Sequence, residues 1–553
     1  MNRADRRKTA KTNKERINDY LIAGRQLMVP RGDNREAQRF FKQALSIEPQ
    51  NGEANLYLGI LEMWVRNLPK ANEFFQKAYQ ADPNNPAVLN NLAISIHEQG
   101  GIPQAVEIYR KVLEIDENNV EARVNLARGL MQMAKPDEAI VEAKRAVEVN
   151  PEFGTGQFVL GTIAQTLGDS EVARESLTQA VKLMPGHMEA NFRLCREIYD
   201  EDDPDAQLAP AREIFMANRS SPESALCYSE LLYGMERHDE AIANLLPHAE
   251  TEHLGMRLNI VNGLANIHAD KGLYEEAVEY HKRALAIASD DPHTRYFYGR
   301  TLNMMGDYKI AAAQLQKSMP ALQMSQEAIA QSMLAQKKGG DPKPFSEEVL
   351  KLVVELDIGP SGGYETVAEL NADVVEALSN KDQTLVHPLD FRRRFGKYSW
   401  ESSFAPGGDD AITALAEILH DKITLYVADM PEGFDSHPMI GRKKFGIGQT
   451  RSWTESITES DGASVSIDQI GWFKGIYFLG VPEECDDDEK KNGWLRLGVP
   501  HFPTKDEVAP DLEIKPQAGK LVLFPAYYWH GFNAMKASNP MVFTTLHIDS
   551  RAG

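Results

Sequence analysis

The chain has 553 residues, of which 42% are hydrophobic and 25% are charged. This length allows roughly three or four domain-sized bodies, the composition excludes a wholly disordered or collagen-like chain, and no apolar run approaches the roughly 20 residues of a membrane-spanning helix. The 60 Lys and Arg against 81 Asp and Glu give a net charge of −21, which disfavours nucleic acid as a partner because the phosphates would be repelled.

Two features indicate a reducing, cytoplasmic location. The cysteines, Cys195, Cys227 and Cys485, are far apart and form neither a disulfide framework nor a zinc-binding pair. The N-terminal segment 1–19 is basic and has no apolar stretch of the kind that a secretory signal requires. We interpret this segment as a solvated tail, and organelle targeting or an anionic partner is the alternative.

Residues 20–335 repeat with a period of 34. Leucine recurs at this spacing with a small residue directly after it, alanine forms a second ladder, and proline ends most of the helical segments. The leucines are Leu58, Leu92, Leu126, Leu160 and Leu194, and the alanines are Ala37, Ala71, Ala105, Ala139 and Ala173, continued by Ala241, Ala277 and Ala311 after a less regular stretch. Because small residues let helices approach closely, the pattern predicts helix pairs stacked in a row.

This spacing resembles the tetratricopeptide repeat, whose unit is a helix-turn-helix of the same length. The resemblance covers about eight or nine units, with a degenerate one near 200–222, and implies an α-solenoid with a concave groove. The aromatic residues of this region have helical spacing and the histidines are scattered, so we expect core packing rather than a catalytic or metal site. The expected function of the array is to bind a protein or peptide partner in the groove.

The pattern changes near residue 338. Glycine and proline mark 336–365 as a linker, and 366–379 and 410–430 have helical spacing. Short aromatic and β-branched runs follow, at 472–479, 494–497, 520–524 and 541–548. They predict a sandwich or jelly roll within 366–553, so the fold class is α + β and multidomain. The acidic run 483–491 is expected to be an exposed loop, with a divalent-cation site as the alternative.

Residues 519–531 read Gly-Lys-Leu-Val-Leu-Phe-Pro-Ala-Tyr-Tyr-Trp-His-Gly. A strand that ends in Phe-Pro and is followed by tryptophan and histidine resembles the 2-oxoglutarate/Fe(II) dioxygenase superfamily, in the bacterial branch fused behind tetratricopeptide repeats. Segments that agree in order are 387–390, Trp453, 471–472 and 493–498. The resemblance spans roughly 370–549, about one domain. It implies a double-stranded β-helix that holds Fe(II) and 2-oxoglutarate at its open mouth, with His530 as the distal metal ligand.

The chain departs from the family's pattern at two places. The resemblance implies two histidines and one carboxylate around iron, but the family's His-x-His pair falls on Ser466-Ile467-Asp468. Asp468 can bind a metal, whereas Ser466 is a poor ligand. The arginine that pairs with the distal carboxylate of 2-oxoglutarate in the family is replaced here by Met541. Asp468 and His530 therefore remain from the implied metal site.

Three interpretations follow. In the first, the domain is an active oxygenase of the hydroxylase type, and other residues replace the missing ones. The candidate metal ligands are His547, His501 and His437, and the candidate 2-oxoglutarate ligands are Lys474, Arg496, Lys536 and Arg551. His547 is favoured because an even number of steps along a strand from Met541 returns it to the same face. In the second interpretation the jelly roll is catalytically retired and persists as a binding or structural module, with iron binding lost or weak. In the third, the repeats are the working part and the jelly roll is accessory.

Overall fold

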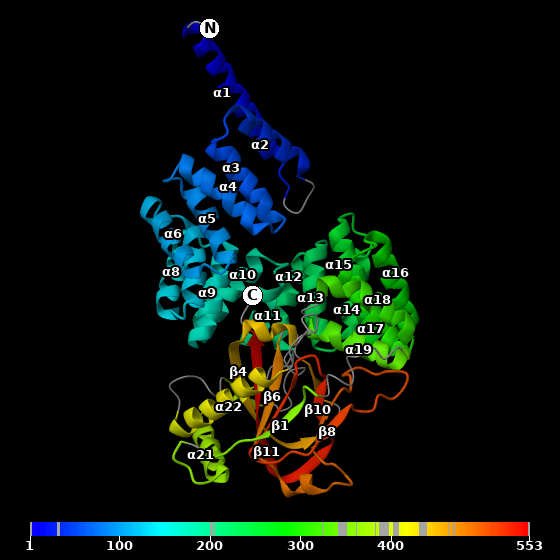
Figure 1. Ribbon diagram of the computed structural model, residues 1–553. Coiled ribbons are helices and arrows are strands. Elements are labelled where there is room, and N and C mark those ends of the chain that lie inside the picture. The colour runs from blue at the N-terminus through cyan, green and yellow to red at the C-terminus, as the bar shows by residue number, and fades with distance from the viewer. Residues whose placement is uncertain are drawn as a thin grey trace. The chain divides into compact units, whose positions relative to one another are not determined.

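The computed structural model describes residues 3–550, except for 30–33, 200–202, 204, 323–324, 341–350, 361, 382, 386–397, 402–408, 431–439, 463 and 468–470. The chain divides into two compact units, Met1–Cys227 and Tyr228–Gly553. The division falls inside the repeat region, so the second unit holds the last repeats together with the β domain (Figure 1).

The first unit is built of helices, and from the first to the eleventh each one contacts the next along the chain. These elements are α1 (Arg3–Gln26), α2 (Arg35–Ile47), α3 (Gly52–Trp64), α4 (Leu68–Ala81), α5 (Pro86–Glu98), α6 (Ile102–Ile115), α7 (Val120–Gln132), α8 (Pro136–Val149), α9 (Gly154–Leu167), α10 (Ser170–Leu183), α11 (Met188–Glu197), η1 (Ala206–Leu208) and α12 (Ala209–Ala217). Helix α1 includes most of segment 1–19, so the basic segment that was expected to be a tail is helical.

The helical pattern continues across the boundary into the second unit. The elements are α13 (Pro222–Gly234), α14 (His238–Leu245), η2 (Leu246–His248), α15 (Leu254–Asp270), α16 (Tyr274–Ile287), α17 (Pro292–Met305), α18 (Tyr308–Leu322) and α19 (Gln326–Gly339). None of the helices that the structure describes combines the length and apolarity needed to cross a membrane.

The two ladders of the sequence mark the contacts between paired helices. All eight ladder alanines are completely buried, and the five ladder leucines are buried as well. Gly59 follows one of these leucines, and a Cβ atom at this position would lie 2.4 Å from the ring of Phe75. The prediction of closely stacked helix pairs is therefore confirmed, and small residues are required where the helices meet.

Polar side chains also recur with the repeat, at the start of the first helix of each pair. Asn51, Asn85 and Asn119 are each 34 residues apart and accept hydrogen bonds from backbone N–H groups in the first turn of α3, α5 and α7. Such caps satisfy donors that have no partner within the helix. Farther along α7 and α9, Arg123 and Gln157 donate to carbonyl groups six residues earlier, those of Glu117 and Pro151. Buried polar residues of the repeats therefore close the turns between helices.

The β domain consists of two antiparallel sheets. The larger sheet has seven strands in the order β1-β9-β6-β11-β4-β3-β2, and the smaller has four in the order β5-β10-β7-β8. The strands are β1 (Val354–Asp357), β2 (Thr384–Leu385), β3 (Tyr398–Glu401), β4 (Ile447–Ser460), β5 (Val465–Ser466), β6 (Phe473–Gly480), β7 (Leu495–Leu497), β8 (Leu512–Ile514), β9 (Lys520–Pro525), β10 (His530–Phe532) and β11 (Met535–Ser550). Strand β1 lies inside the segment expected as a linker, so the sheet recruits part of that segment.

The two sheets face each other across an aromatic interior. Phe532 of the small sheet contacts Phe478 and Phe543 of the large one, with ring centroids 6.4 Å and 4.9 Å apart. The predicted jelly roll is therefore confirmed. Helices α21 (Val367–Ser379) and α22 (Asp410–Asp429) share a hydrophobic core with the large sheet, and Asn371 of α21 accepts a 2.6 Å hydrogen bond from the Tyr477 hydroxyl. The short helices η4 (Ile440–Phe445) and η5 (Glu483–Asp486) complete the domain.

Candidate functional site

The candidate site lies between the sheets, where β10 pairs with β5 and β7. His530 is directly opposite Ser466 on one side and Leu497 on the other, so these three side chains project from the same face. Gly531 makes the pairing possible, because a Cβ atom there would lie 2.4 Å from the Ser464 carbonyl oxygen. The strand pairing therefore places the predicted metal ligand opposite the serine that replaces the family's histidine.

His530 is completely buried, and both of its ring nitrogens have neighbours. Nδ1 lies 3.1 Å from the Tyr528 carbonyl oxygen, and Nε2 lies 3.2 Å from Nζ of Lys474. Because a carbonyl only accepts, the hydrogen bond to Tyr528 places a proton on Nδ1 and leaves the Nε2 lone pair directed at Lys474. This is the tautomer in which a histidine binds a metal through Nε2.

Lys474 comes from the middle of the large sheet and is 1% exposed. Its strand neighbours are His547 on β11 and Phe524 on β9, and Phe524 also contacts the His530 ring. The ammonium lies 5.5 Å from the centre of the Trp453 ring, where the negative face of the indole attracts a cation. Removing an ammonium from water is costly, so Lys474 needs polar neighbours of this kind inside the domain.

Two hydroxyl groups in this interior have no hydrogen-bond partner among the residues that the structure describes. Ser466 Oγ and Thr545 Oγ1 are both buried and unsatisfied. Thr545 lies on the same face of β11 as Met541 and His547, because the three are separated by even numbers of residues. Buried polar atoms without partners are uncommon and are frequently satisfied by a small molecule or water. The two hydroxyls are therefore available to a water molecule or a small polar ligand.

The other predicted metal ligands lie in different surroundings. His547 Nε2 is 2.7 Å from Nη2 of Arg451 and 3.0 Å from a carboxylate oxygen of Asp549, so this nitrogen already has two polar neighbours. His501 is half-buried, and its ring meets the Phe502 ring edge to face. Asp468 and His437 lie outside the residues that the structure describes. Within the described residues, no three His, Cys, Asp or Glu side chains form a metal-binding group.

The remaining cationic candidates do not face the interior. Arg496 lies between the buried Leu495 and Leu497, donates to the Gly462 carbonyl, and burial lowers its pKa below the usual range. Lys536 is exposed near one end of β11, and Arg551 lies outside the described residues. Lys474 is therefore the candidate that the structure brings next to His530. Thr545 was not singled out from the sequence, although strand alternation from Met541 would have found it.

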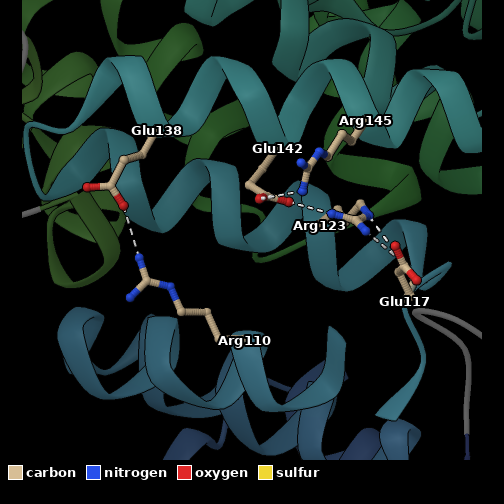
Figure 2. A network of polar contacts seen from close by, with 6 residues as sticks. All are labelled: Arg110, Glu117, Arg123, Glu138, Glu142 and Arg145. Carbon is tan, nitrogen blue, oxygen red and sulfur yellow. Dashed lines mark hydrogen bonds and ion pairs between the residues drawn. The ribbon is translucent and has the colours of Figure 1, made fainter. Parts of the chain in front are cut away.

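The repeats contain a different polar cluster, on α6 to α8 of the first unit. Figure 2 shows Arg123 between the Glu117 carbonyl and Glu142, at 2.8 Å and 2.6 Å. Arg145 approaches the second oxygen of Glu142, and Arg110 pairs with Glu138. Each arginine in this cluster has a glutamate, so the arrangement is typical of a structural network rather than a ligand site.

Comparisons with known families agree that the chain consists of helical repeats followed by a β domain. Families described as "Tetratricopeptide repeat" match residues 30–86, 97–154, 156–187 and 257–324. A family described as "Putative 2OG-Fe(II) oxygenase" matches residues 451–542, which include Ser466, Lys474 and His530. No curated protein matches the chain significantly.

Several solved structures resemble the helical part. They include one from a study titled "Functional Characterization of Pseudomonas Aeruginosa pilF" (19% identity, 38% of this chain and 96% of that one, TM-score 0.34), and YrrB, titled "a TPR protein with an unusual peptide-binding site" (23%, 33% and 94%, TM-score 0.27). A third is MamA from Desulfovibrio magneticus RS-1 (18%, 31% and 96%, TM-score 0.27). By its family matches, this chain joins tetratricopeptide repeats to a region that matches the 2OG-Fe(II) oxygenase family.

Proposed function

We propose that the β domain binds Fe(II) and 2-oxoglutarate and hydroxylates a polypeptide that the repeats recruit. One observation carries the proposal: His530 and Lys474, both buried, meet between the sheets, with Nε2 and Nζ 3.2 Å apart. An imidazole nitrogen suits iron, and a buried ammonium suits a carboxylate. The two groups that the reaction needs are thus adjacent, although the family's arginine is absent.

The residues fit iron held by a reduced set of protein ligands. His530 would supply Nε2, and Asp468 would supply a carboxylate two residues after Ser466. The buried and unsatisfied Ser466 hydroxyl faces His530 across the strand pair, so it suits a water molecule in the place of the family's histidine. Bound Fe(II) and 2-oxoglutarate would supply the activation of O₂ that hydroxylation requires.

Lys474 would anchor the distal carboxylate of 2-oxoglutarate. Its Nζ offers three donors, and the unsatisfied Thr545 hydroxyl on the neighbouring strand could donate to the same group. Met541, at the place of the family's arginine, is completely buried on the same face of β11 and contributes only packing. The carboxylate anchor would thus have moved from β11 to β6.

The repeats would bind the polypeptide substrate and bring it to the β domain. Stacked helix pairs of this type present an extended surface to protein partners. The net charge of −21 favours a basic or neutral polypeptide. The repeats would thus determine which protein reaches the β domain.

A retired domain is the second candidate, and the same contact favours it. An ammonium 3.2 Å from His530 Nε2 lies in the direction from which a metal would bind, so Lys474 must move before iron is held by this nitrogen. A chain that had lost iron would tolerate this contact permanently. The active and the retired domain therefore differ in whether the Lys474 ammonium moves away from His530 when a metal is present.

Anaerobic titration of the full-length protein with Fe(II) and 2-oxoglutarate separates them, because the chelated complex gives a visible charge-transfer band. We expect a saturable band in the wild type and none in His530→Ala. Lys474→Met should weaken 2-oxoglutarate binding by about tenfold to a hundredfold, the loss of one charged hydrogen bond. Lys536→Met, the same change on an exposed lysine, is the matched control. A wild type that retains no iron and gives no band would establish the retired domain.

A further inference from the structure

The residues next to Ser466 and His530 in the chain point away from the candidate site, toward the outer face of the small sheet. Val465 and Ile467 flank Ser466, and Trp529 directly precedes His530. Because side chains alternate along a strand, residues next to inward-facing ones point outward. An outer face of a sheet is normally wet, yet these three side chains are only 8%, 8% and 3% exposed. Something outside the sheet covers them.

The covering residues come from the last repeats. Val465, Ile467 and Trp529 belong to one hydrophobic cluster with residues of α15, α16, α17 and α19, all of them within the second unit. These residues are Ala269, Ala277, Met304, Ala330 and Leu334. The strands that carry Ser466 and His530 are therefore supported from behind by repeat helices.

The segment between β7 and β8 holds this contact in place. Its Lys505 N–H donates to the Met304 carbonyl at 3.0 Å, and Lys338 Nζ of α19 donates to the Glu507 carbonyl at 2.9 Å. Lys337, the neighbouring residue on α19, forms an ion pair with Asp511. The segment is thus fixed to α17 and α19 by backbone as well as side-chain groups.

Phe502 lies within this segment and contacts both a repeat helix and the β domain. The Arg300 guanidinium is 5.6 Å from the centre of its ring, and Arg300 is itself buried and paired with Asp270 at 2.5 Å. In the β domain, the Trp529 ring meets the Phe502 ring edge to face, with ring centroids 5.7 Å apart and an interplanar angle of 86°. A continuous series of contacts therefore runs from Arg300 through Phe502 and Trp529 to the residue before His530.

We infer that helices α15, α16, α17 and α19 are the outer wall of the candidate site, and that Arg300 and Phe502 are positioning residues that act on His530 through Trp529. The effect on iron rests on the proposed function, whereas the effect on His530 does not. The inference also means that the face of the repeats that holds Phe502 is occupied by the chain's own segment. An external partner must use another surface of the array.

Hydrogen exchange of the metal-free, full-length protein tests the positioning directly. Phe502→Leu keeps an apolar side chain but removes the ring, and we expect amides of residues 528–532 to exchange up to about tenfold faster, the equivalent of one lost aromatic contact. Phe502→Tyr retains the ring and should restore slow exchange. Phe75→Leu is the matched control, because Phe75 is also buried but lies in the first unit. Arg300→Lys, which keeps the charge but lacks the planar group, is the second variant if Phe502→Leu fails to fold.

A second readout concerns the metal. Co(II), used as a probe for Fe(II), should bind the wild type and Phe502→Tyr alike, and its visible spectrum should change in Phe502→Leu. Unchanged exchange at 528–532 in Phe502→Leu and Arg300→Lys would overturn the inference. Faster exchange in a protein that binds neither Co(II) nor Fe(II) would support the positioning role and reject the proposed oxygenase.

Discussion

The repeats and the β domain each bury a cation, and the two cations have different surroundings. Arg123 in α7 lies between a turn carbonyl and Glu142, at a position where the following repeat places Gln157 with the same bond to a turn. Lys474 lies between two sheets, beside His530 and above the Trp453 ring. The fold explains a buried charge that follows the repeat period, whereas the proposed function assigns a ligand to the buried charge beside His530.

The largest expected effect tests the structural half of this comparison. Arg123→Met leaves the Glu117 carbonyl without its side-chain donor and removes the closer of the two cations at Glu142, so it should lower the free energy of unfolding by about 3 kcal/mol. Urea denaturation measures this change. Arg110→Met is the matched control, because Arg110 is half exposed and its ion pair should contribute about 1 kcal/mol or less. Equal losses in the two variants would contradict the distinction between a buried and a surface arginine.

The next prediction tests the functional half. Ser466→His introduces an imidazole directly opposite His530 and should strengthen Fe(II) or Co(II) binding by about a hundredfold, since a further nitrogen ligand replaces water. Isothermal titration with Co(II) measures the affinity, and thermal denaturation shows whether the larger side chain is tolerated. Ser464→His places the same group at an exposed position and should leave metal binding unchanged. A folded Ser466→His protein with wild-type affinity would argue against a metal at this place.

A third prediction concerns a buried histidine of the repeats. Burial, and then the Arg300 guanidinium, lower the pKa of His281 from 6.5 to about 3. The folded protein thus keeps His281 neutral while the unfolded chain protonates it, so stability is complete above pH 6.5 and decreases as the pH falls toward 3. The slope should be up to about 1.4 kcal/mol per pH unit. Urea midpoints at pH 7 and pH 5 should differ less in His281→Gln, and an unchanged difference would assign the pH dependence to other groups.

The smallest effect returns to the repeats. Asn119 caps α7 by accepting a hydrogen bond from the Ala122 N–H, so Asn119→Ala should destabilise the protein by about 1 kcal/mol. Asn119→Asp keeps the acceptor and should preserve stability. The cofactor titration should be the same in all three proteins, because this position closes a turn. A changed titration would show that the repeats and the β-domain site are coupled more widely than through Phe502.

Much of the helical part could be predicted because its information is local. Ala71 and Ala105 are buried for the same reason, a helix contact that recurs every 34 residues, and the ladder reports that contact directly. In the β domain, the motif at 519–531 was sufficient to single out His530 as a candidate metal ligand, which stays a prediction. It was not sufficient to choose among Lys474, Arg496 and Lys536, since the choice depends on which strand lies opposite β10. That information is spread over pairings between distant segments.

The sequence by itself determined the period of the repeats, the change to β structure, and the family resemblance with its missing histidine and arginine. Each of these features depends on the types and spacing of residues that are close together in the chain. Only the tertiary structure decided that Lys474 meets His530, that β1 joins the large sheet, and that Phe502 connects the last repeats to Trp529. These contacts join residues far apart in the chain, and they form only when the sheets close and the repeat helices cover the outer face of the strands.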